Sequence, residues 1–311
     1  SRGLGDVYKR QGLSGIINVY KPKGITSHDV VYKLRKILGI KKIGHTGTLD
    51  PDAEGVLPMC IGRATKTADM LTAADKEYMA EVTLGFSTDT QDSSGSVIKS
   101  VDMDDFIVSS DDIENAVTKY IGDINQLPPM YSAIKIGGKK LYELARQGIE
   151  IERKPRFVKI NSIKLLDFYP NKEHVMKFKM LVSCSKGTYI RALCNDIGED
   201  LKCFAHMSGL VRTKSGRFDL EHSYKLSEIE NMAAIGNMSF FTPVDEVFSE
   251  YGKLVLSDNA AFKMCNGTQV KSPAEAKDGV TYRVYDINGK FLTISRAENG
   301  KMKILKTFYQ D

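Results

Sequence analysis

The sequence predicts an α+β protein in which a larger domain is followed by a small β-rich module. Between residues 16 and 201, strand-like alternation of apolar residues occurs together with the three-to-four spacing of amphipathic helices. Beyond residue 249, short strand candidates are separated by the turn sequences NGT, KDG, NGK and ENG. A chain of 311 residues has room for one large domain and one small one.

The first elements are a strand, a helix and a loop. Residues 16–20 are an apolar run that predicts a short strand. Apolar residues then recur at helical spacing through 30–38, and Gly39 stands where a C-terminal glycine belongs. The glycine-rich stretch 44–66 is interpreted as a loop.

The middle of the chain alternates between strand and helix signals. The pattern predicts strands at 78–84, 156–166 and 177–184, and helices at 111–121 and through Leu193, Ile197 and Leu201. Paired prolines, paired glycines and lysines at 126–148 predict a long basic arm with a short helix through Leu141 and Leu144. In the C-terminal module the pattern predicts strands at 253–256, 281–285, 291–295 and 302–305.

The first eleven residues, SRGLGDVYKRQ, show neither a helical nor a strand period. They lack a start methionine, and the first Met of the chain is Met59. We interpret residues 1–11 as a vector-derived or reading-frame scar, with a natural flexible leader as the alternative, and leave them out of the fold.

Composition excludes several classes of protein. The apolar runs are too short to cross a bilayer, and a secretory signal pattern is not present. Five scattered cysteines without a C-x-x-C pair favour free thiols in a reducing cytosol, so we expect a cytoplasmic protein. The five histidines do not pair with cysteines at zinc-ligand spacing, and we expect no metal site.

Charge is segregated along the chain, although the net charge is only +5. Residues 89–114 carry eight acids and one base, whereas residues 135–159 carry eight bases and three acids. Residues 201–217 add four bases and no acid. Such segregation can produce one positive face suited to a polyanion such as RNA, although any single cluster is more often a solvated surface.

Asp50 is the candidate that local sequence leaves open between a turn residue, a metal ligand and a nucleophile. It precedes Pro51, so its backbone is biased away from the α region. Gly44, Gly47 and Gly55 around it allow another backbone to approach closely. The loop lacks the phosphate-binding G-x-x-x-x-G-K-[ST] pattern. Local sequence by itself favours a plain turn.

Two other residues change that balance. Arg191 is a permanent cation in the first turn of a predicted helix, and Tyr78 is an aromatic residue with a polar tip on the inner face of a predicted strand. A carboxylate, a guanidinium and a phenol under a positive surface would suit an enzyme acting on a nucleotide. Spacing alone does not show that the three residues meet.

Five segments in succession resemble the motifs of the TruB family, the bacterial tRNA pseudouridine-55 synthases. They are INVYKPKGITSHDVV, GHTGTLDPDAEGVLPMCIGRATK, KEYMAEVTLG, LPPMYSAIKIGGKKLYELAR and SKGTYIRALCNDIG. They occur in the family's order, and with the tail they cover nearly everything from residue 15 onward. The segment G-H-T-G-x-L-D-P is highly specific, so a chance match to all five motifs is not credible.

The resemblance implies a reaction and a set of site residues. The family isomerises one uridine of the tRNA T-loop to pseudouridine, without a cofactor or a metal, on a base flipped out of the loop. Asp50 matches the nucleophile, Arg191 its arginine partner, and Tyr78 the tyrosine that packs on the base and is proposed to transfer a proton. The resemblance further implies substrate-binding positions at His45, Gly47, Tyr189, Leu210, Lys21 and Arg212, with Lys21 in the motif that supports the catalytic loop.

On physical grounds we expect the Arg191 guanidinium to depress the pKa of Asp50 and keep it ionised near neutrality. Flipping the base costs a few kcal/mol of unstacking, and stacking on Tyr78 can offset part of this. Splayed bases in RNA loops are also what proteins read most readily.

The resemblance also implies the architecture and the partner. It implies the pseudouridine synthase fold, with a mixed, largely antiparallel central sheet flanked by helices and loops over residues 12–249. Residues 250–311 resemble, more loosely, a small PUA-like RNA-binding domain, and a packing module is the alternative. The basic insertion at about 125–155 is similar to the arm that clamps the T-arm of tRNA, and the phosphate contacts it implies fall on Lys135, Lys139, Lys140, Arg146, Arg153 and Lys154. A monomer that binds tRNA is expected.

Two alternatives remain at the level of sequence. A guide-dependent relative would act on other RNAs, although the eukaryotic members of that kind are expected to carry long basic tails that this sequence does not show. A non-catalytic tRNA-binding and folding protein would use the same positive surface without needing Asp50.

Overall fold

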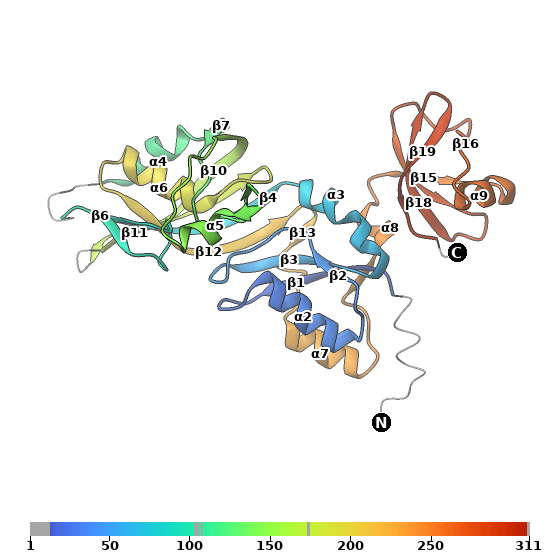
Figure 1. Cartoon of the computed structure of the whole chain (residues 1–311), viewed down its shortest axis with the longest axis horizontal. Coiled ribbons are helices and arrows are strands. Elements are labelled where there is room, and N and C mark those ends of the chain that lie inside the picture. The colour runs from blue at the N-terminus through green and yellow to red at the C-terminus, as the bar shows by residue number, and fades with distance from the viewer. Residues whose placement is uncertain (1–12, 103–105, 107, 173–174, 310–311) are drawn as a thin grey trace.

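The computed structural model describes residues 13–102, 106, 108–172 and 175–309. The interpretation of residues 1–11 as a scar therefore lies outside the described residues. A large central sheet with helices on it is followed by a separate five-stranded module at the C-terminal end (Figure 1). The predicted α+β class is confirmed.

The central sheet has ten strands, eight of them in the order β14-β1-β3-β12-β4-β11-β10-β7, with β13 beside β12 and β2 beside β3. Their bounds are β1 Gly15–Lys21, β2 Ile43–His45, β3 Glu54–Ile61, β4 Lys76–Leu84, β7 Gly122–Gln126, β10 Arg156–Lys172, β11 Val175–Cys184, β12 Ala205–Ser215, β13 Phe218–Asp219 and β14 Phe241–Pro243. Among these described strands, β3 and β12 pair in parallel and the other pairs are antiparallel. The sheet is therefore mixed and largely antiparallel, as expected.

Helices and two small hairpins complete the larger domain. The helices are α2 Ser27–Leu38, the 3₁₀ helix η1 Gly62–Thr67, α3 Ala68–Ala73, α4 Ser110–Thr118, α5 Leu141–Ala145, α6 Ile190–Asp200, α7 Leu226–Ala234 and α8 Val244–Val247; the hairpins are β5 Phe86–Thr88 with β6 Val97–Ser100, and β8 Lys135–Ile136 with β9 Lys139–Lys140. Helix α2 begins with a capping box between Thr26 and Asp29 and ends at Gly39, whose φ of 69° is the left-handed conformation that glycine tolerates.

Two hydrophobic cores cover different parts of the central sheet. In the first, α4 and α6 pack against β4, β10 and β11; in the second, α2 and α7 pack against β1 and β3 (Figure 1). The half-buried side chains of Tyr78 and Leu210 contact both cores. These two residues therefore mark the seam between the cores.

The prediction that residues 44–66 form a loop is wrong, because this stretch contains the central strand β3. All but the first residue of β3 are buried, so the strand shows no alternation of polar and apolar side chains. Gly55 and Pro58 within it also resemble loop residues. Only residues 46–53, between β2 and β3, form the loop.

The C-terminal module is a twisted sheet with one helix. Its elements are β15 Gly252–Val255, α9 Asp258–Cys265, β16 Val270–Lys271, β17 Thr281–Tyr285, β18 Phe291–Glu298 and β19 Lys301–Thr307, and the strands lie in the order β15-β17-β18-β19-β16. The four predicted strands match β15, β17, β18 and β19. Helix α9 was missed, because it spans only eight residues and buries only Ala261 and Met264.

Polar and apolar contacts join the module to the larger domain. Lys306 on β19 forms an ion pair with Asp69 at the start of α3, at 2.8 Å. Arg63 donates to the carbonyl of Phe308, also at 2.8 Å. Ile294 of β18 is fully buried in a cluster that includes Ile16 of the central sheet. The module is therefore packed on the larger domain through η1 and α3.

Replacing Gly55 by alanine should destabilise the seam between β3 and β12. A Cβ at this position would overlap the carbonyl oxygen of Arg212 and lie 2.9 Å from its backbone nitrogen, and the φ of Gly55 is +103°. Strain and overpacking together should cost roughly 3 kcal/mol of unfolding free energy or more. Gly39→Ala is the matched control, because Gly39 also has a positive φ but has open space around it. It should cost about 1 kcal/mol in the same urea titration; equal losses would show that the dihedral angle matters and the contact does not.

Candidate active site

Asp50 begins a turn at the end of the loop between β2 and β3. The N–H of Ala53 donates to the Asp50 carbonyl at 3.1 Å, and Pro51 occupies the second turn position, where its fixed φ fits. The local interpretation of Asp50 as a turn residue is therefore correct for its backbone. Its side chain does something else, because the carboxylate is directed to a cation from a distant helix.

That cation is Arg191, in the first turn of α6. Its Nε lies 3.0 Å from Asp50 Oδ2, and its Nη1 lies 3.5 Å from Asp92 Oδ2. Nη1 also donates to the carbonyl of Thr90 (3.0 Å), and Nη2 donates to the carbonyl of Tyr131 (2.8 Å). The Arg191 side chain is only 7% exposed, whereas that of Asp50 is 41% exposed. The guanidinium is thus fixed on all sides, while the carboxylate it holds remains open to a ligand.

Asp92 is a member of this cluster that sequence reasoning did not single out. Its Oδ1 accepts hydrogen bonds from Thr90 Oγ1 (2.7 Å) and from the N–H of Ser94 (2.9 Å), which leaves Oδ2 for Arg191. The run TDTQDSSG, rich in side chains that bond their own backbone, was the available signal. It was counted only as part of an acidic segment.

The surroundings of Asp50 raise the pKa of its carboxyl above the ordinary value. Burial among protein atoms is the largest cause, even though part of the carboxylate surface is exposed. Arg191 and Lys21 lower the pKa, and Asp92 raises it. The expectation of a depressed pKa is therefore wrong, because Arg191 is shared between two carboxylates and offsets only part of the desolvation.

The loop that carries Asp50 is held from beneath by Lys21. The Lys21 ammonium donates to the carbonyls of Pro22 (2.9 Å), Pro51 (2.9 Å) and Ala53 (2.6 Å), and the residue is fully buried. Burial lowers its pKa to about 8. The prediction that Lys21 binds substrate is not what the structure shows. Lys21 supports the turn of the catalytic loop, as its motif implied.

Arg212 also supports the loop that carries Asp50. It is 1% exposed; its Nε donates to the carbonyl of Val56 (2.6 Å) and its Nη2 to that of Gly47 (3.2 Å). Strand β12 sets it directly opposite Tyr78 of β4. A guanidinium occupied in this way does not face a substrate, so the substrate-binding assignment of Arg212 is corrected to one of holding the loop and the tyrosine.

Tyr78 and Leu210 form an apolar surface where the two hydrophobic cores meet. Leu210 pairs with Ala80 and therefore lies diagonally from Tyr78 on the same face. Burial raises the pKa of the Tyr78 phenol, and the neighbouring Arg212 guanidinium opposes that rise. The phenol is consequently protonated at neutral pH.

His45, Gly47 and Tyr189 complete the predicted set. His45 ends β2, and its Nδ1 accepts from the N–H of Gly47 at 3.4 Å. Burial, with help from Arg212, lowers the pKa of His45, so the imidazole is neutral at pH 7. Tyr189 is the N-cap of α6, two residues before Arg191. Asp50 and Arg191 form an ion pair and the charge of Asp50 acts on Tyr78, so the structure brings these three residues together from distant parts of the chain.

The predicted arm residues are not equivalent. Lys135, Lys139 and Lys154 are exposed. Lys140 and Arg146 lie over the ring of Tyr142, on α5, at 5.2 and 5.5 Å from its centroid. Arg153 instead donates to the carbonyl of Pro128 (2.9 Å) and pairs with Glu150 (3.5 Å), so it fastens the base of the arm.

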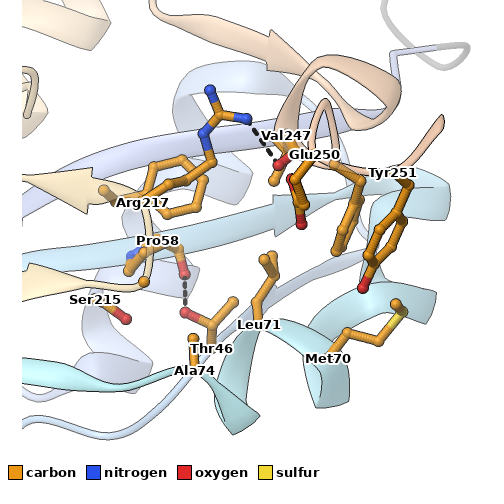
Figure 2. A pocket seen from close by; sticks show the side chains of 13 residues that line it. Thr46, Pro58, Met70, Leu71, Ala74, Ser215, Arg217, Val247, Glu250 and Tyr251 are labelled. Atoms are coloured by element: carbon orange, nitrogen blue, oxygen red, sulfur yellow. Dashed lines mark hydrogen bonds between the residues drawn. The ribbon is translucent and has the colours of Figure 1, made fainter. Parts of the chain in front are cut away.

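A cavity of about 470 Å³ lies beside this site but does not contain it (Figure 2). It is bounded by α3, the turn at 215–218 and the segment 247–251. Thr46 and Pro58 form one wall, and the Thr46 hydroxyl donates to the Pro58 carbonyl at 3.2 Å. Asp50, Tyr78 and Arg191 are not among its lining residues, so the seam is the better candidate for substrate chemistry.

The described part of the chain shows neither a candidate metal site nor a membrane-spanning helix. Its His, Cys, Asp and Glu side chains form no group of three or more that could hold a metal ion. Its helices include none with the length and apolarity needed to cross a membrane.

Family models match the chain over most of its length. A model described as "TruB family pseudouridylate synthase (N terminal domain)" matches residues 35–190, and one described as "tRNA pseudouridylate synthase B C-terminal domain" matches residues 191–248. The chain belongs to the TruB family. The resemblance stated from the five motifs is therefore confirmed.

Relatives and solved structures agree with the TruB assignment. The chain is 46% identical over 290 residues to the tRNA pseudouridine synthase B of Clostridioides difficile, covering 92% of each chain. It is 47% identical over 284 residues to that of Bacillus cytotoxicus, covering 91% of this chain and 92% of the relative. A solved structure described as "Crystal Structure of a Cbf5-Nop10-Gar1 Complex" is 26% identical, with a TM-score of 0.70 over 97% of this chain and 87% of that one. A TruB-type pseudouridine synthase fold is thereby confirmed.

Proposed function

We propose that this chain is a tRNA pseudouridine synthase that isomerises uridine 55 in the T-loop of tRNA. The observation that carries the proposal is the 3.0 Å pair between Asp50, which remains partly exposed, and the buried Arg191. The charge of Asp50 also acts on the phenol of Tyr78, which together with Leu210 contacts both hydrophobic cores. A carboxylate oriented by a fixed guanidinium is the arrangement expected of a nucleophile. The relatives named tRNA pseudouridine synthase B support the same reaction.

The reaction balances within the nucleotide. The bond between N1 of uracil and C1′ of ribose breaks, the uracil turns, and a bond forms between C5 and C1′. C5 loses a proton and N1 gains one, so neither a cofactor nor a metal is consumed. We propose Asp50 as the nucleophile of this reaction. The Asp50 carboxylate acts in its ionised form, which Arg191 favours against the effect of burial.

We assign Tyr78 to the uracil ring. Its phenol is kept protonated by burial, which suits stacking and hydrogen-bond donation. Removing the C5 proton with the same phenol would first require its own proton to pass to another group. His45, Gly47, Tyr189 and Leu210 then surround the flipped nucleotide. Because Nδ1 of the neutral His45 imidazole accepts from Gly47, the Nε2–H is the group that can donate to the nucleotide.

The rest of the chain would hold the RNA. Unstacking a base costs a few kcal/mol, which contacts elsewhere on the RNA must offset. The exposed lysines of the arm suit phosphates of the T-arm. The module at 250–311 is proposed as a PUA-like RNA-binding domain attached to a catalytic domain at 12–249. We propose a monomer that acts in the cytoplasm, where its five free cysteines would remain reduced.

The direct test is an isomerisation assay on a minimal T-arm stem-loop. RNA labelled with tritium at C5 of uridine should release tritium, because C5 exchanges its hydrogen for the bond to C1′. The same RNA with cytidine in place of the target uridine is the control and should release none. Absence of release from the uridine-containing RNA, with the RNA bound, would contradict the proposal and favour a tRNA-binding protein without this activity.

Alanine substitution of Lys135 and Lys139 together should weaken T-arm binding and flatten its salt dependence. Each phosphate contact contributes roughly 0.7 to 0.9 to the slope of log K against log salt, so the pair should reduce the slope by about 1.5. The control is Lys33→Ala with Lys36→Ala, two exposed lysines of α2. The measurement is the dissociation constant at salt concentrations from roughly 50 to 300 mM, a range that includes physiological ionic strength. An unaltered slope would remove both arm lysines from the phosphate contacts.

A further inference from the structure

The root of the basic arm is attached to the start of α6 by hydrogen bonds. Gln126, the last residue of β7, is 3% exposed, and its side-chain amide bonds the backbone of Tyr189 twice. The N–H of Tyr189 donates to Gln126 Oε1 at 2.8 Å, and Gln126 Nε2 donates to the Tyr189 carbonyl at 3.0 Å. An amide that satisfies both backbone groups of one residue fixes that residue in place and in direction.

A second attachment joins the same arm to Arg191 itself. Tyr131, five residues after Gln126, supplies the carbonyl that accepts from Arg191 Nη2 at 2.8 Å. Between them lie Pro128 and Pro129, whose fixed φ angles stiffen the segment. Arg153, on the returning side of the arm, donates to the Pro128 carbonyl at 2.9 Å. The stiff stretch from Gln126 to Tyr131 is therefore fastened at its first residue to Tyr189 and at its last to Arg191.

The basic arm leaves the central sheet and returns to it beside Gln126. Gln126 pairs with Arg156 in the register of β7 and β10, so residues 127–155 leave the sheet and return to it here. Tyr189 is the N-cap of α6 and has no side-chain cap of its own. The Gln126 amide thus holds the helix start two residues before Arg191. A displacement of the arm root would be transmitted to the guanidinium through backbone and side chain alike.

We propose that Gln126 is a positioning residue for catalysis: its amide fixes the start of α6, and with it Arg191, against the root of the arm that contacts RNA. The role rests on the proposed function, since it concerns the arginine that orients the Asp50 nucleophile. Binding of RNA to the arm and orientation of the catalytic ion pair are then coupled events, because both involve the segment from Gln126 to Tyr131. Gln126 does not touch the reacting atoms.

The test compares Gln126→Met, which removes both hydrogen bonds and keeps a similar volume, with Gln147→Met. Gln147 is an exposed residue of the arm, so the same chemical change is made away from α6. The first readout is the titration of the Asp50 carboxyl by ¹³C NMR in the free protein. Arg191 lowers the pKa of Asp50, so loosening Arg191 should raise that pKa by about 0.5 or more, whereas Gln147→Met should leave it unchanged.

The second readout is single-turnover pseudouridine formation on the T-arm. Gln126→Met should slow turnover roughly ten- to hundred-fold and should leave the dissociation constant for RNA within about three-fold of wild type. The acidic limb of its pH–rate profile should also move to higher pH. Its effect should be less than additive with Arg191→Lys, because both changes act on one guanidinium. If Gln126→Met does not fold, Gln126→Asn keeps an amide in the core but is one methylene too short for both contacts.

The outcomes separate this inference from the proposed function. A folded Gln126 variant with the Asp50 titration and the turnover of wild type would overturn the positioning role, as would strict additivity with Arg191→Lys. A wild-type chain that forms no pseudouridine would instead contradict the proposed function. In that case the NMR titration, which needs no RNA, still decides whether Gln126 controls the Asp50–Arg191 pair.

Discussion

Replacing Asp50 by asparagine is expected to abolish pseudouridine formation on a T-arm stem-loop, by roughly 10⁴-fold or more. Asparagine has nearly the same shape but cannot act as an anionic nucleophile. Binding should stay within a few-fold of wild type, because RNA affinity comes chiefly from phosphate contacts elsewhere. Single-turnover rates and dissociation constants measured on the same RNA would separate chemistry from binding.

The same substitution should make the protein slightly more stable at neutral pH. Folding raises the pKa of Asp50, so ionisation of this group favours the unfolded chain. The penalty is absent well below the ordinary value of 3.8, where the carboxyl is protonated in both states; it grows as the pH rises from 3.8 to the folded-state pKa and is constant above that pKa. The unfolding temperature of Asp50→Asn should therefore be higher than that of wild type at pH 7. The two unfolding temperatures should nearly coincide at about pH 3.5, near the unperturbed pKa of an aspartate.

Asp52→Asn is the matched control for both effects. Asp52 belongs to the same turn but is exposed, and the structure gives it no place beside Arg191. Its replacement should leave turnover near that of wild type. Retained turnover in Asp50→Asn, or an equal loss in Asp52→Asn, would remove the Asp50 carboxylate from the chemistry.

Sequence reasoning predicted the fold best where side-chain periodicity reflects one-sided burial. Helix α2 and strand β4 show clear periodicity, so their patterns indicated where both end, although each begins two or three residues earlier than the pattern. Strand β3 is buried on both faces and contains Pro58, so its residues looked like a loop. Helix α9 is too short for its two buried positions to produce a convincing period.

The residues of the candidate site, too, could be predicted only in part from the sequence. Asp50 and Arg191 are about 140 residues apart, and only the order of family motifs, not any local spacing, related one to the other. Their 3.0 Å contact is a product of the tertiary structure. Asp92 could not be recognised, because a loop aspartate among serines and threonines usually forms a local turn, and Asp92 does that too.

The family resemblance was a weak guide to substrate contacts, because a motif position does not reveal burial. It implied substrate-binding positions at Lys21 and Arg212, yet both are among the largest fully buried side chains described. Both donate to backbone carbonyls at the two ends of the loop that carries Asp50. A buried cation is costly unless its donors are satisfied, and here backbone carbonyls of the loop and of its neighbours satisfy them. Their positive charge therefore serves to fix the position of Asp50.

Substituting lysine for Arg191 should reduce turnover roughly a hundred-fold or more while leaving RNA binding within a few-fold. The arginine uses all three of its nitrogens to contact Asp50, Asp92 and the carbonyls of Thr90 and Tyr131, which a single ammonium cannot do. Because Arg191 lowers the pKa of Asp50, a less well placed cation should also move the acidic limb of the rate profile to higher pH. Single-turnover rates across a pH series provide the measurement.

The control for Arg191→Lys is an arginine outside the site. Arg217 donates from Nη1 to the carbonyl of Val247 at 2.8 Å and to Ser249 Oγ at 3.0 Å, beside the cavity of Figure 2. Arg217→Lys makes the same substitution and retains the same charge, yet should leave both turnover and the pH limb unchanged. If the two variants behaved alike, the effect of replacing an arginine would be a general structural one. If Arg191→Lys kept full turnover, the charge alone would suffice, and the geometry of the Asp50–Arg191 pair would carry no part of the rate.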